Sequence, residues 1–179
     1  MPSPISTLHT YFEENDLWHK TIELKRGDHL HLAGDRDDNV YYVDSGLLRA
    51  YVLVNDDEQI IRFAYQGDFL VAMDSFFTGG PTMLYASALR KTTVRVIRKS
   101  KYNAAIVNDP ELNKIWQQIL SWMVVGQLER EIDLLTNDPA ERFRRVAERS
   151  PRLFQEVPAK YIANYLRMTA ETLSRLKAR

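Results

Sequence analysis

Residues 21 to 99 alternate apolar and polar side chains in short segments, which glycine and aspartate turns separate. Successive side chains of a β-strand point to opposite faces, so this spacing indicates strands with one buried face. The expected strands are Thr21–Lys25, His29–Leu32, Val40–Val43, Leu47–Val54, Gln59–Tyr65 and a last segment Tyr85–Ile97. In Leu47–Val54, the residues Leu48, Ala50, Val52 and Val54 share one face. Many short strands with regular turns predict an antiparallel jelly roll or barrel.

After Ser100 the apolar spacing becomes helical, and the longest helix is expected from Asp109-Pro110 to about Thr136. A helix of roughly 25 residues spans about 38 Å, more than is needed to cover the β unit. Its apolar surface is also wider than one stripe, so part of it must be buried elsewhere, most simply against a second copy of the helix. The alternative is a helix used up by packing within its own chain. The predicted dimer contacts are Ile115, Ile119, Met123, Gly126 and Leu128.

The segment Val157–Arg179 carries two short helical patterns with a break at Arg167-Met168. Thr169 stands where an N-cap belongs, and the second helix places Leu173 and Leu176 on a buried face. Two short helices joined by a three-to-four-residue turn predict a helix-turn-helix, whose second helix reaches base edges in the DNA major groove. The alternative is an ordinary helical hairpin at the end of a domain.

Charge is distributed unevenly although the formal net charge is zero. Residues 137–179 hold ten Lys/Arg and five Asp/Glu, whereas the first 136 residues hold 14 and 19. A basic end on an acidic body is the asymmetry expected when one end approaches phosphates. The chain has no cysteine, no long apolar span and no signal-peptide pattern, so we expect a cytoplasmic protein without disulfides or cysteine-bound metal.

The string IANYLRMTAETLSRL resembles the helix-turn-helix of the Crp/Fnr family, the cyclic-AMP receptor protein and its bacterial relatives. The earlier strings KRGDHLHLAGD, VYYVDSGLLRAY and YQGDF match the same family's layout. The resemblance implies an α+β chain with two domains. Residues 1–136 would form a double-stranded β-helix (a jelly roll of the cyclic-nucleotide-binding type) and the long dimerisation helix over about 110–136, and residues 137–179 would form the helix-turn-helix domain.

The resemblance also implies a function and partners: a homodimeric transcription regulator that binds double-stranded DNA and works with RNA polymerase. In the family, the Glu and Arg of the recognition helix read cytosine and guanine, which places these roles on Glu171 and Arg175. Ala170 departs from the family, where an Arg is common, and Arg167 takes a turn position often held by Gly. The predicted base contacts are Ala170, Glu171, Ser174 and Arg175. The predicted phosphate contacts are Lys160, Arg167, Thr169, Lys177 and Arg179.

An effector site is predicted in the β unit, but not one for cyclic AMP. Nucleotide-binding members of the family hold the cyclic phosphate with an Arg-Ser pair, and Leu84 and Tyr85 stand in those places. No basic residue occurs between Arg62 and Arg90, so a buried phosphate would lack a counter-charge. An unidentified small effector, or none, is expected. The predicted pocket residues are Phe63, Asp68, Phe69, Met83, Leu84 and Tyr85.

His29 and His31 share one face of a strand and invite comparison with a cupin-type metal site. No later histidine completes such a set, so we expect two solvent-facing histidines, no metal and no cofactor. No nucleophile–base motif emerges either, and the chain is expected not to be an enzyme. A metal-dependent cupin-like enzyme and a β-roll module whose terminal helices only pack are the alternative functions.

Overall fold

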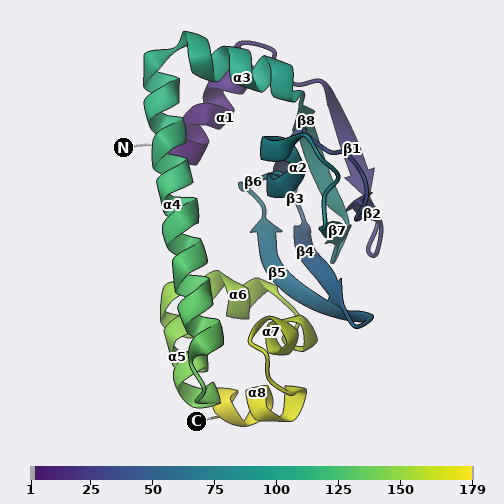
Figure 1. Ribbon diagram of the computed structural model, residues 1–179, viewed down its shortest axis with the longest axis vertical. Helices are drawn as coiled ribbons and strands as arrows, with labels where there is room; N and C mark the ends of the chain where they lie inside the picture. The colour runs from purple at the N-terminus through teal and green to yellow at the C-terminus, as the bar shows by residue number, and fades with distance from the viewer. Residues whose placement is uncertain (1–2, 179) are drawn as a thin grey trace. The chain divides into compact units, whose positions relative to one another are not determined.

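The computed structural model describes residues 3–178 and confirms an α+β chain, in which a β-roll precedes a run of helices (Figure 1). The strands are β1 (Lys20–Leu24), β2 (His29–His31), β3 (Val40–Ser45), β4 (Leu47–Val54), β5 (Asp57–Tyr65), β6 (Phe69–Leu70), β7 (Tyr85–Ala88) and β8 (Thr92–Ile97). The helices are α1 (Pro4–Glu14), α2 (Met73–Thr78), α3 (Lys99–Asn108), α4 (Pro110–Leu135), α5 (Pro139–Arg149), α6 (Pro151–Glu156), α7 (Ala159–Tyr165) and α8 (Ala170–Lys177).

The chain divides into two compact units, and the division falls inside α4, between Leu120 and Ser121. The first unit contains the strands, α1 to α3 and the beginning of α4. The second contains the rest of α4 and α5 to α8. The expectation that the DNA-binding domain itself begins at residue 137 stays a prediction. Among residues 3–178, no helix combines the length and the apolar character that crossing a membrane requires.

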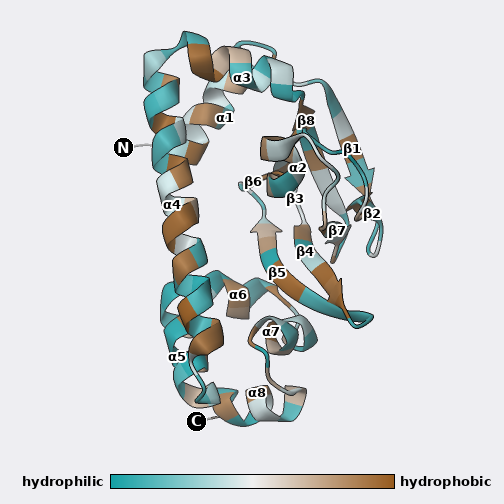
Figure 2. Cartoon of the chain, in the orientation of Figure 1, coloured by the Kyte–Doolittle hydropathy of each residue, from teal (hydrophilic) through white to brown (hydrophobic). Residues whose placement is uncertain are grey.

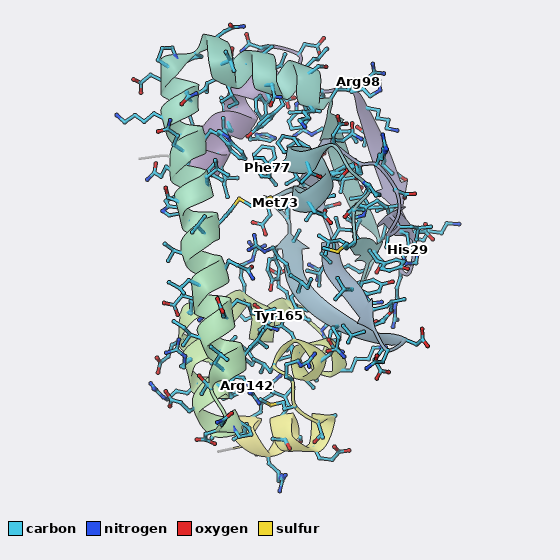
Figure 3. All side chains as sticks on the ribbon, in the orientation of Figure 1. His29, Met73, Phe77, Arg98, Arg142 and Tyr165 are labelled. Atoms are coloured by element: carbon cyan, nitrogen blue, oxygen red, sulfur yellow. The ribbon has the colours of Figure 1, made fainter. Side chains whose placement is uncertain are left out.

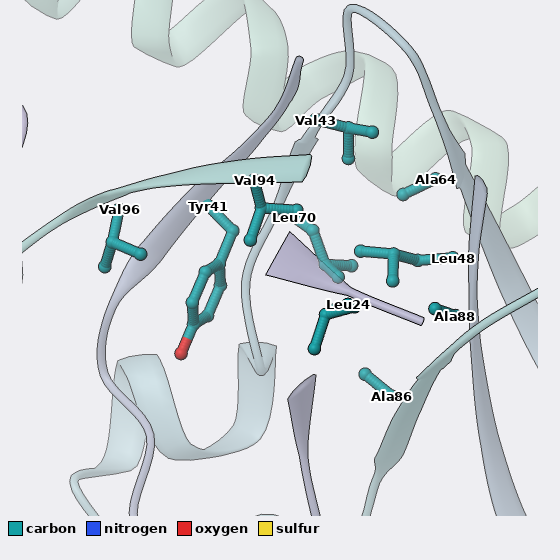
Figure 4. Close-up of a cluster of buried hydrophobic side chains, with 10 residues drawn as sticks. All are labelled: Leu24, Tyr41, Val43, Leu48, Ala64, Leu70, Ala86, Ala88, Val94 and Val96. Atoms are coloured by element: carbon teal, nitrogen blue, oxygen red, sulfur yellow. The ribbon is translucent and has the colours of Figure 1, made fainter. Parts of the chain in front are cut away.

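The first unit is built on two four-stranded antiparallel sheets, with strand orders β1-β8-β3-β6 and β2-β7-β4-β5. Side chains from both sheets meet between them and fill the interior of the roll (Figure 4). This cluster consists of Leu24, Tyr41, Val43, Leu48, Ala64, Leu70, Ala86, Ala88, Val94 and Val96. Alternation along the strands supplies these side chains, as the sequence pattern predicts.

Turn residues close the roll where the sequence places them. Asn55 and Asp56 join β4 to β5 with φ values of 52° and 65°, the left-handed pair of a tight hairpin turn. Gly46 joins β3 to β4 at φ 104°, and a Cβ there would lie 2.5 Å from the Cα of Thr92. Glycine is required at residue 46 for both reasons, because other residues rarely adopt this φ and no space remains for a side chain.

Two details of the strand prediction are wrong. The expected segment Tyr85–Ile97 is two strands, since a turn at residues 89–91 carries the chain from the second sheet (β7) to the first (β8). In β4 the register shifts between Ala50 and Tyr51. A bulge of this kind reverses the alternation, so Tyr51 is buried, Val52 is half-buried and Val54 is half exposed.

A second apolar cluster joins α1, α3 and the start of α4 to the first sheet. Phe12 of α1 is fully buried there, with Phe69 and Tyr102 at ring-centroid distances of 5.9 and 5.8 Å. Ser3 caps α1 by accepting a hydrogen bond from the Ser6 N–H, and Asp109 caps α4 by accepting from Glu111 and Leu112. The predicted start of the long helix is therefore confirmed.

The second unit is helical and has a small apolar core. Asp138 caps α5 by accepting from the N–H groups of Ala140 and Glu141, which confirms the predicted stop and restart at Asn137-Asp138-Pro139. The short helix α6 was not anticipated from the sequence. The buried apolar side chains of α5 to α8 and their connections are Val146, Leu153, Val157, Ile162, Ala163, Leu166 and Leu173. Figure 2 shows the mixture of hydrophilic and hydrophobic residues along these helices.

Candidate nucleic-acid interface

The turn between α7 and α8 has the geometry that the sequence predicts. Arg167 adopts φ 55°, in the left-handed region that a turn position otherwise given to glycine requires. The Met168 N–H donates to the Ala163 carbonyl and the Arg167 N–H to the Asn164 carbonyl, both at 3.0 Å. These bonds close the C-terminal end of α7.

Thr169 begins α8 as an N-cap, because its hydroxyl accepts the Thr172 N–H at 3.1 Å. Beyond it, α8 buries Leu173 almost completely and half-buries Leu176. The four predicted base-contact residues are all exposed: Ala170, Glu171, Ser174 and Arg175. Positions 170, 171, 174 and 175 lie on one face of a helix with 3.6 residues per turn. The second helix of the motif thus presents one small, polar and charged face.

The two charged side chains of this face, Glu171 and Arg175, suit different hydrogen-bonding groups. The pKa of Glu171 is lowered by hydrogen bonds from its own backbone N–H and from the Thr169 hydroxyl, so its carboxylate is ionised at neutral pH. Arg175 makes a weak hydrogen bond, 3.4 Å from its Nη2 to the Thr172 hydroxyl. A fixed carboxylate can accept from a base amino group, and a guanidinium can donate to the two acceptors of guanine.

The predicted phosphate contacts lie around these helices. Lys160 and Lys177 are exposed, with their ammonium groups 4.6 Å from the Tyr161 ring centroid and 5.6 Å from that of Phe154. Arg167 is exposed on the turn, and the hydroxyl of Thr169 is engaged in the cap. Arg179 lies outside the described residues.

A buried ionic network that the sequence does not predict joins α4 to α5 within the second unit. The Asp133 side chain is fully buried and accepts from Arg145 and Arg149. Glu129, one turn earlier, pairs with the same two arginines at 3.1 and 3.4 Å. The hydrogen bond that Arg149 donates to the Asp133 carboxylate raises the pKa of Arg149. Glu129 and Asp133 are four residues apart, as are Arg145 and Arg149, so the sequence places each pair on one helix face. Only the fold shows that these two faces meet.

Two further arginines of the second unit are buried, Arg130 on α4 and Arg142 on α5. Arg130 donates to the Tyr165 carbonyl and lies over the Tyr165 ring at 3.8 Å. Arg142 donates to the Thr136 carbonyl at 2.8 Å and to the Arg167 carbonyl at 3.3 Å. Figure 3 labels Arg142 and Tyr165 among these helices. Nothing in the spacing of the basic residues distinguishes these two from arginines that face solvent.

The predicted effector-pocket residues lie on several elements of the first unit and differ in exposure. Phe69 packs on the outer side of its sheet against Phe12 and Tyr42, while its neighbour Leu70 enters the roll. Met83 is 72% exposed. Asp68 accepts the Tyr65 N–H in the turn before β6. Alternation along β6 and the exposed loop after α2 place these residues apart, and the effector pocket stays a prediction.

The other three predicted pocket residues lie on the second sheet or beside it. Phe63 is buried on β5, and Tyr85 of β7 stacks on Tyr51 with ring centroids 5.1 Å apart. The Leu84 carbonyl lies 3.1 Å from Nδ1 of His31. These contacts are made with the chain's own residues.

The loop that follows α2 is held by a carboxylate of the chain itself. Asp74 accepts from the Ser75 and Met83 N–H groups and from the Thr82 hydroxyl, at 2.7 to 2.9 Å. Burial acts to raise the pKa of Asp74, but these hydrogen bonds outweigh it and the pKa is lowered. Backbone N–H groups that would suit an added anion are therefore already used by an internal one.

The histidine prediction is half wrong. His29 is exposed, with Nε2 3.0 Å from the Tyr51 hydroxyl, but His31 is buried beside Leu84. The register of β2 shifts between these two residues, so they no longer share one face. Among residues 3–178, no group of three or more His, Asp or Glu side chains is arranged to hold a metal ion.

The exposed apolar face of α4 differs from the predicted one. Ile115 and Ile119 are half-buried and pack against the apolar cluster of the first unit, and the predicted dimer contacts stay a prediction. Met123 is half-buried, Gly126 is exposed, and Leu128 is 55% exposed. The exposed apolar stripe that contains Leu128 consists of Val124, Val125, Leu128, Ile132 and Leu135. At 3.6 residues per turn this stripe is roughly opposite the side of Ile115 and Ile119.

The fold defines a class of protein: a β-roll of the cyclic-nucleotide-binding type, a long helix, and a helical unit that carries a helix-turn-helix. A family model described as "Cyclic nucleotide-binding domain" matches residues 21–109. The fumarate nitrate reduction regulatory protein of Klebsiella oxytoca is 31% identical over 168 residues, which cover 87% of this chain and 66% of that protein. The Escherichia coli K12 counterpart is 30% identical over the same coverage.

Solved structures agree with this class. CooA from Carboxydothermus hydrogenoformans, as a double mutant, superposes with a TM-score of 0.77 over 99% of this chain and 83% of its own, at 18% identity. FixK2 from Bradyrhizobium japonicum gives 0.70 over 89% and 82%, at 23% identity. The chain belongs to the Crp/Fnr family. The matched part of the chain spans 66% of the length of these two curated relatives.

Proposed function

We propose that this chain is a DNA-binding transcription regulator of the Crp/Fnr type, not an enzyme, that works as a homodimer in the cytoplasm. Family membership supports the proposal, since the matched relatives are named as regulatory proteins. The observation that carries it is α8, whose exposed face offers Glu171 and Arg175 just beyond the Thr169 cap. RNA polymerase is the proposed protein partner of the DNA-bound dimer.

The test begins with selection of bound duplexes from random DNA, followed by a matched pair of variants of α8. Arg175→Ala removes a proposed base contact and should cost about 1–3 kcal/mol on the selected site, with little change on random DNA. Lys177→Ala, two residues away on the same helix, removes a proposed phosphate contact. It should weaken binding to all duplexes alike and reduce the salt slope by about one. Equal losses on selected and random DNA for Arg175→Ala would contradict the base-reading role.

The proposed dimer uses the exposed stripe of α4 centred on Leu128. Leu128→Glu puts a charge into that stripe and should raise the dimer dissociation constant by about 30-fold or more, as loss of a buried hot spot does. Gln127→Glu introduces the same charge next to it, on an exposed position off the stripe, and should leave the dimer intact. Sedimentation equilibrium measures both. A Leu128→Glu protein that stays dimeric would show that another surface pairs the chains.

The proposed effector, where one exists, is not an anionic cyclic nucleotide. Asp74 supports this, because a phosphate at the same loop would meet a carboxylate and N–H groups that are already engaged. The absence of any Lys or Arg between Arg62 and Arg90 agrees with it. Calorimetric titration with cyclic AMP should give no heat of binding up to about millimolar ligand. Micromolar binding would contradict this part of the proposal.

A further inference from the structure

The end of α7 and the turn after it leave backbone carbonyls that no N–H of their own helix can reach. Two of these carbonyls have partners from elsewhere in the second unit. Arg130 of α4 donates to the Tyr165 carbonyl, and Arg142 of α5 donates to the Arg167 carbonyl. Arg167 is also the residue held in the left-handed conformation, at φ 55°. Guanidinium groups of two other helices therefore bind the last carbonyl of α7 and a carbonyl within the turn.

Arg142 also hydrogen-bonds to a residue at the end of α4. Its other terminal nitrogen donates to the carbonyl of Thr136, the residue that follows α4, at 2.8 Å. One planar guanidinium thus joins the end of the long helix to the turn that precedes α8. An arginine can do this because its five N–H donors are fixed in a rigid fork, whereas a lysine ammonium lacks that fixed geometry.

Burial shows that these contacts are not incidental surface bonds. Arg130 is 6% exposed and Arg142 is 8% exposed. Burial lowers the pKa of Arg130, the sign that desolvation works against its charge. Apolar side chains could fill such positions without this cost, but they could not donate hydrogen bonds to the two carbonyls. What the arginines contribute beyond packing is a defined geometry at the turn.

We propose that Arg130 and Arg142 are positioning residues for DNA reading. They hold the turn at Arg167 to α4 and α5, and so fix the direction in which α8 presents Glu171 and Arg175. Neither residue contacts DNA in this account; both act through the turn. The inference rests on the proposed function for its consequence in DNA binding, but the effect on the turn is measurable without DNA.

The experiment uses the full chain and a matched set of arginine variants. Arg142→Met removes the two bonds and keeps an unbranched side chain. Arg144→Met, two residues along α5, is the control, since Arg144 is exposed and forms ion pairs with Glu141 and Glu148 of its own helix. Amide hydrogen exchange is followed at Met168 and Leu173, and at Val146 of α5. Affinity is measured for the selected duplex and for random DNA.

In Arg142→Met, exchange at Met168 and Leu173 should accelerate by about tenfold or more, while Val146 changes little. Affinity for the selected duplex should fall by about tenfold or more, with affinity for random DNA and the salt slope nearly unchanged. Arg130→Met should act in the same direction, and Arg144→Met should change neither readout. Arg142→Met behaving like Arg144→Met in exchange would overturn the proposal, as would parallel losses on selected and random DNA.

Arg142→Lys covers the case in which Arg142→Met does not fold. Lysine keeps the charge without the rigid fork, so exchange at Met168 should still accelerate. Wild-type exchange and wild-type discrimination in Arg142→Lys would overturn the proposal. If the unmodified chain discriminates no duplex, the proposed function fails, and the exchange measurements still decide whether the two arginines hold the turn.

Discussion

The interior of each of the two units is stabilised by a different kind of interaction. In the first unit, ten mostly apolar side chains close the space between two sheets, and one of them, Tyr41, donates its hydroxyl to the buried carboxylate of Asp37. Ion pairs such as those of Arg95 with Glu13 and Asp44 lie outside that space. In the second unit, charged side chains are part of the interior: Arg130, Asp133 and Arg142 are all buried. A helical unit of this size buries little apolar surface, so hydrogen-bonded charges take a larger share in fixing its geometry.

The difference has a physical consequence for how each unit tolerates change. An apolar interior resists loss of volume or added bulk, but it has no preferred directions. A buried ionic network depends on direction, and removal of one partner leaves the other desolvated without compensation. The β-roll should therefore fail mainly through steric changes, and the helical unit mainly through changes of charge or hydrogen bonding.

The largest effect is expected from a steric change in the roll. Gly46→Ala should lower the free energy of unfolding of the first unit by more than about 3 kcal/mol, because the new Cβ meets the Thr92 backbone at an unfavourable φ. Gly34→Ala is the control, since Gly34 has φ 94° but open space around it. It should cost about 1 kcal/mol. Hydrogen exchange of each unit measures both free-energy changes. Equal losses for Gly46→Ala and Gly34→Ala would show that the positive φ, and not the contact with Thr92, determines the loss of stability.

A change of charge without change of size should act next, on the second unit. Asp133→Asn should lower its unfolding free energy by about 1–3 kcal/mol, because the amide cannot balance Arg145 and Arg149. Glu129→Gln alters the other carboxylate that pairs with the same arginines, but Glu129 is 39% exposed. It should cost less than about 1 kcal/mol. A first unit destabilised as much as the second by Asp133→Asn would remove the contrast between the units.

The smallest effect should be a pH dependence confined to the first unit. Burial, and then the charge of Arg95, lower the pKa of His9 below 6.5. The unfolded chain therefore binds more protons than the folded one as the pH falls through 6.5, so stability decreases in that direction and levels off below the folded pKa. Hydrogen exchange between pH 8 and 5.5 measures this for each unit. His9→Gln should make the first unit's stability less dependent on pH, and an unchanged slope would assign the effect to another group.

Much of the local structure could be read from the sequence. The caps at Asp138 and Thr169 and the start of α4 at Pro110 follow from residue types within a few positions of each other, whereas the left-handed Arg167 is what the family resemblance implies. The strands of the roll followed from alternation, except where a bulge in β2 or β4 shifted the register. A bulge depends on the partner strand, and the sequence of one strand alone does not announce it.

The exposed face of α8 was also determined by sequence, because a helix of eight residues with one buried leucine stripe has only one way to lie. Tertiary structure alone decided three other features: which side of α4 faces its own chain, how the residues of the supposed effector pocket are separated, and which arginines are buried. Each depends on contacts between segments far apart in the chain, such as Arg142 with Arg167. Local spacing fixes the periodicity of an element, but its neighbours fix which face is covered and which charge finds a partner.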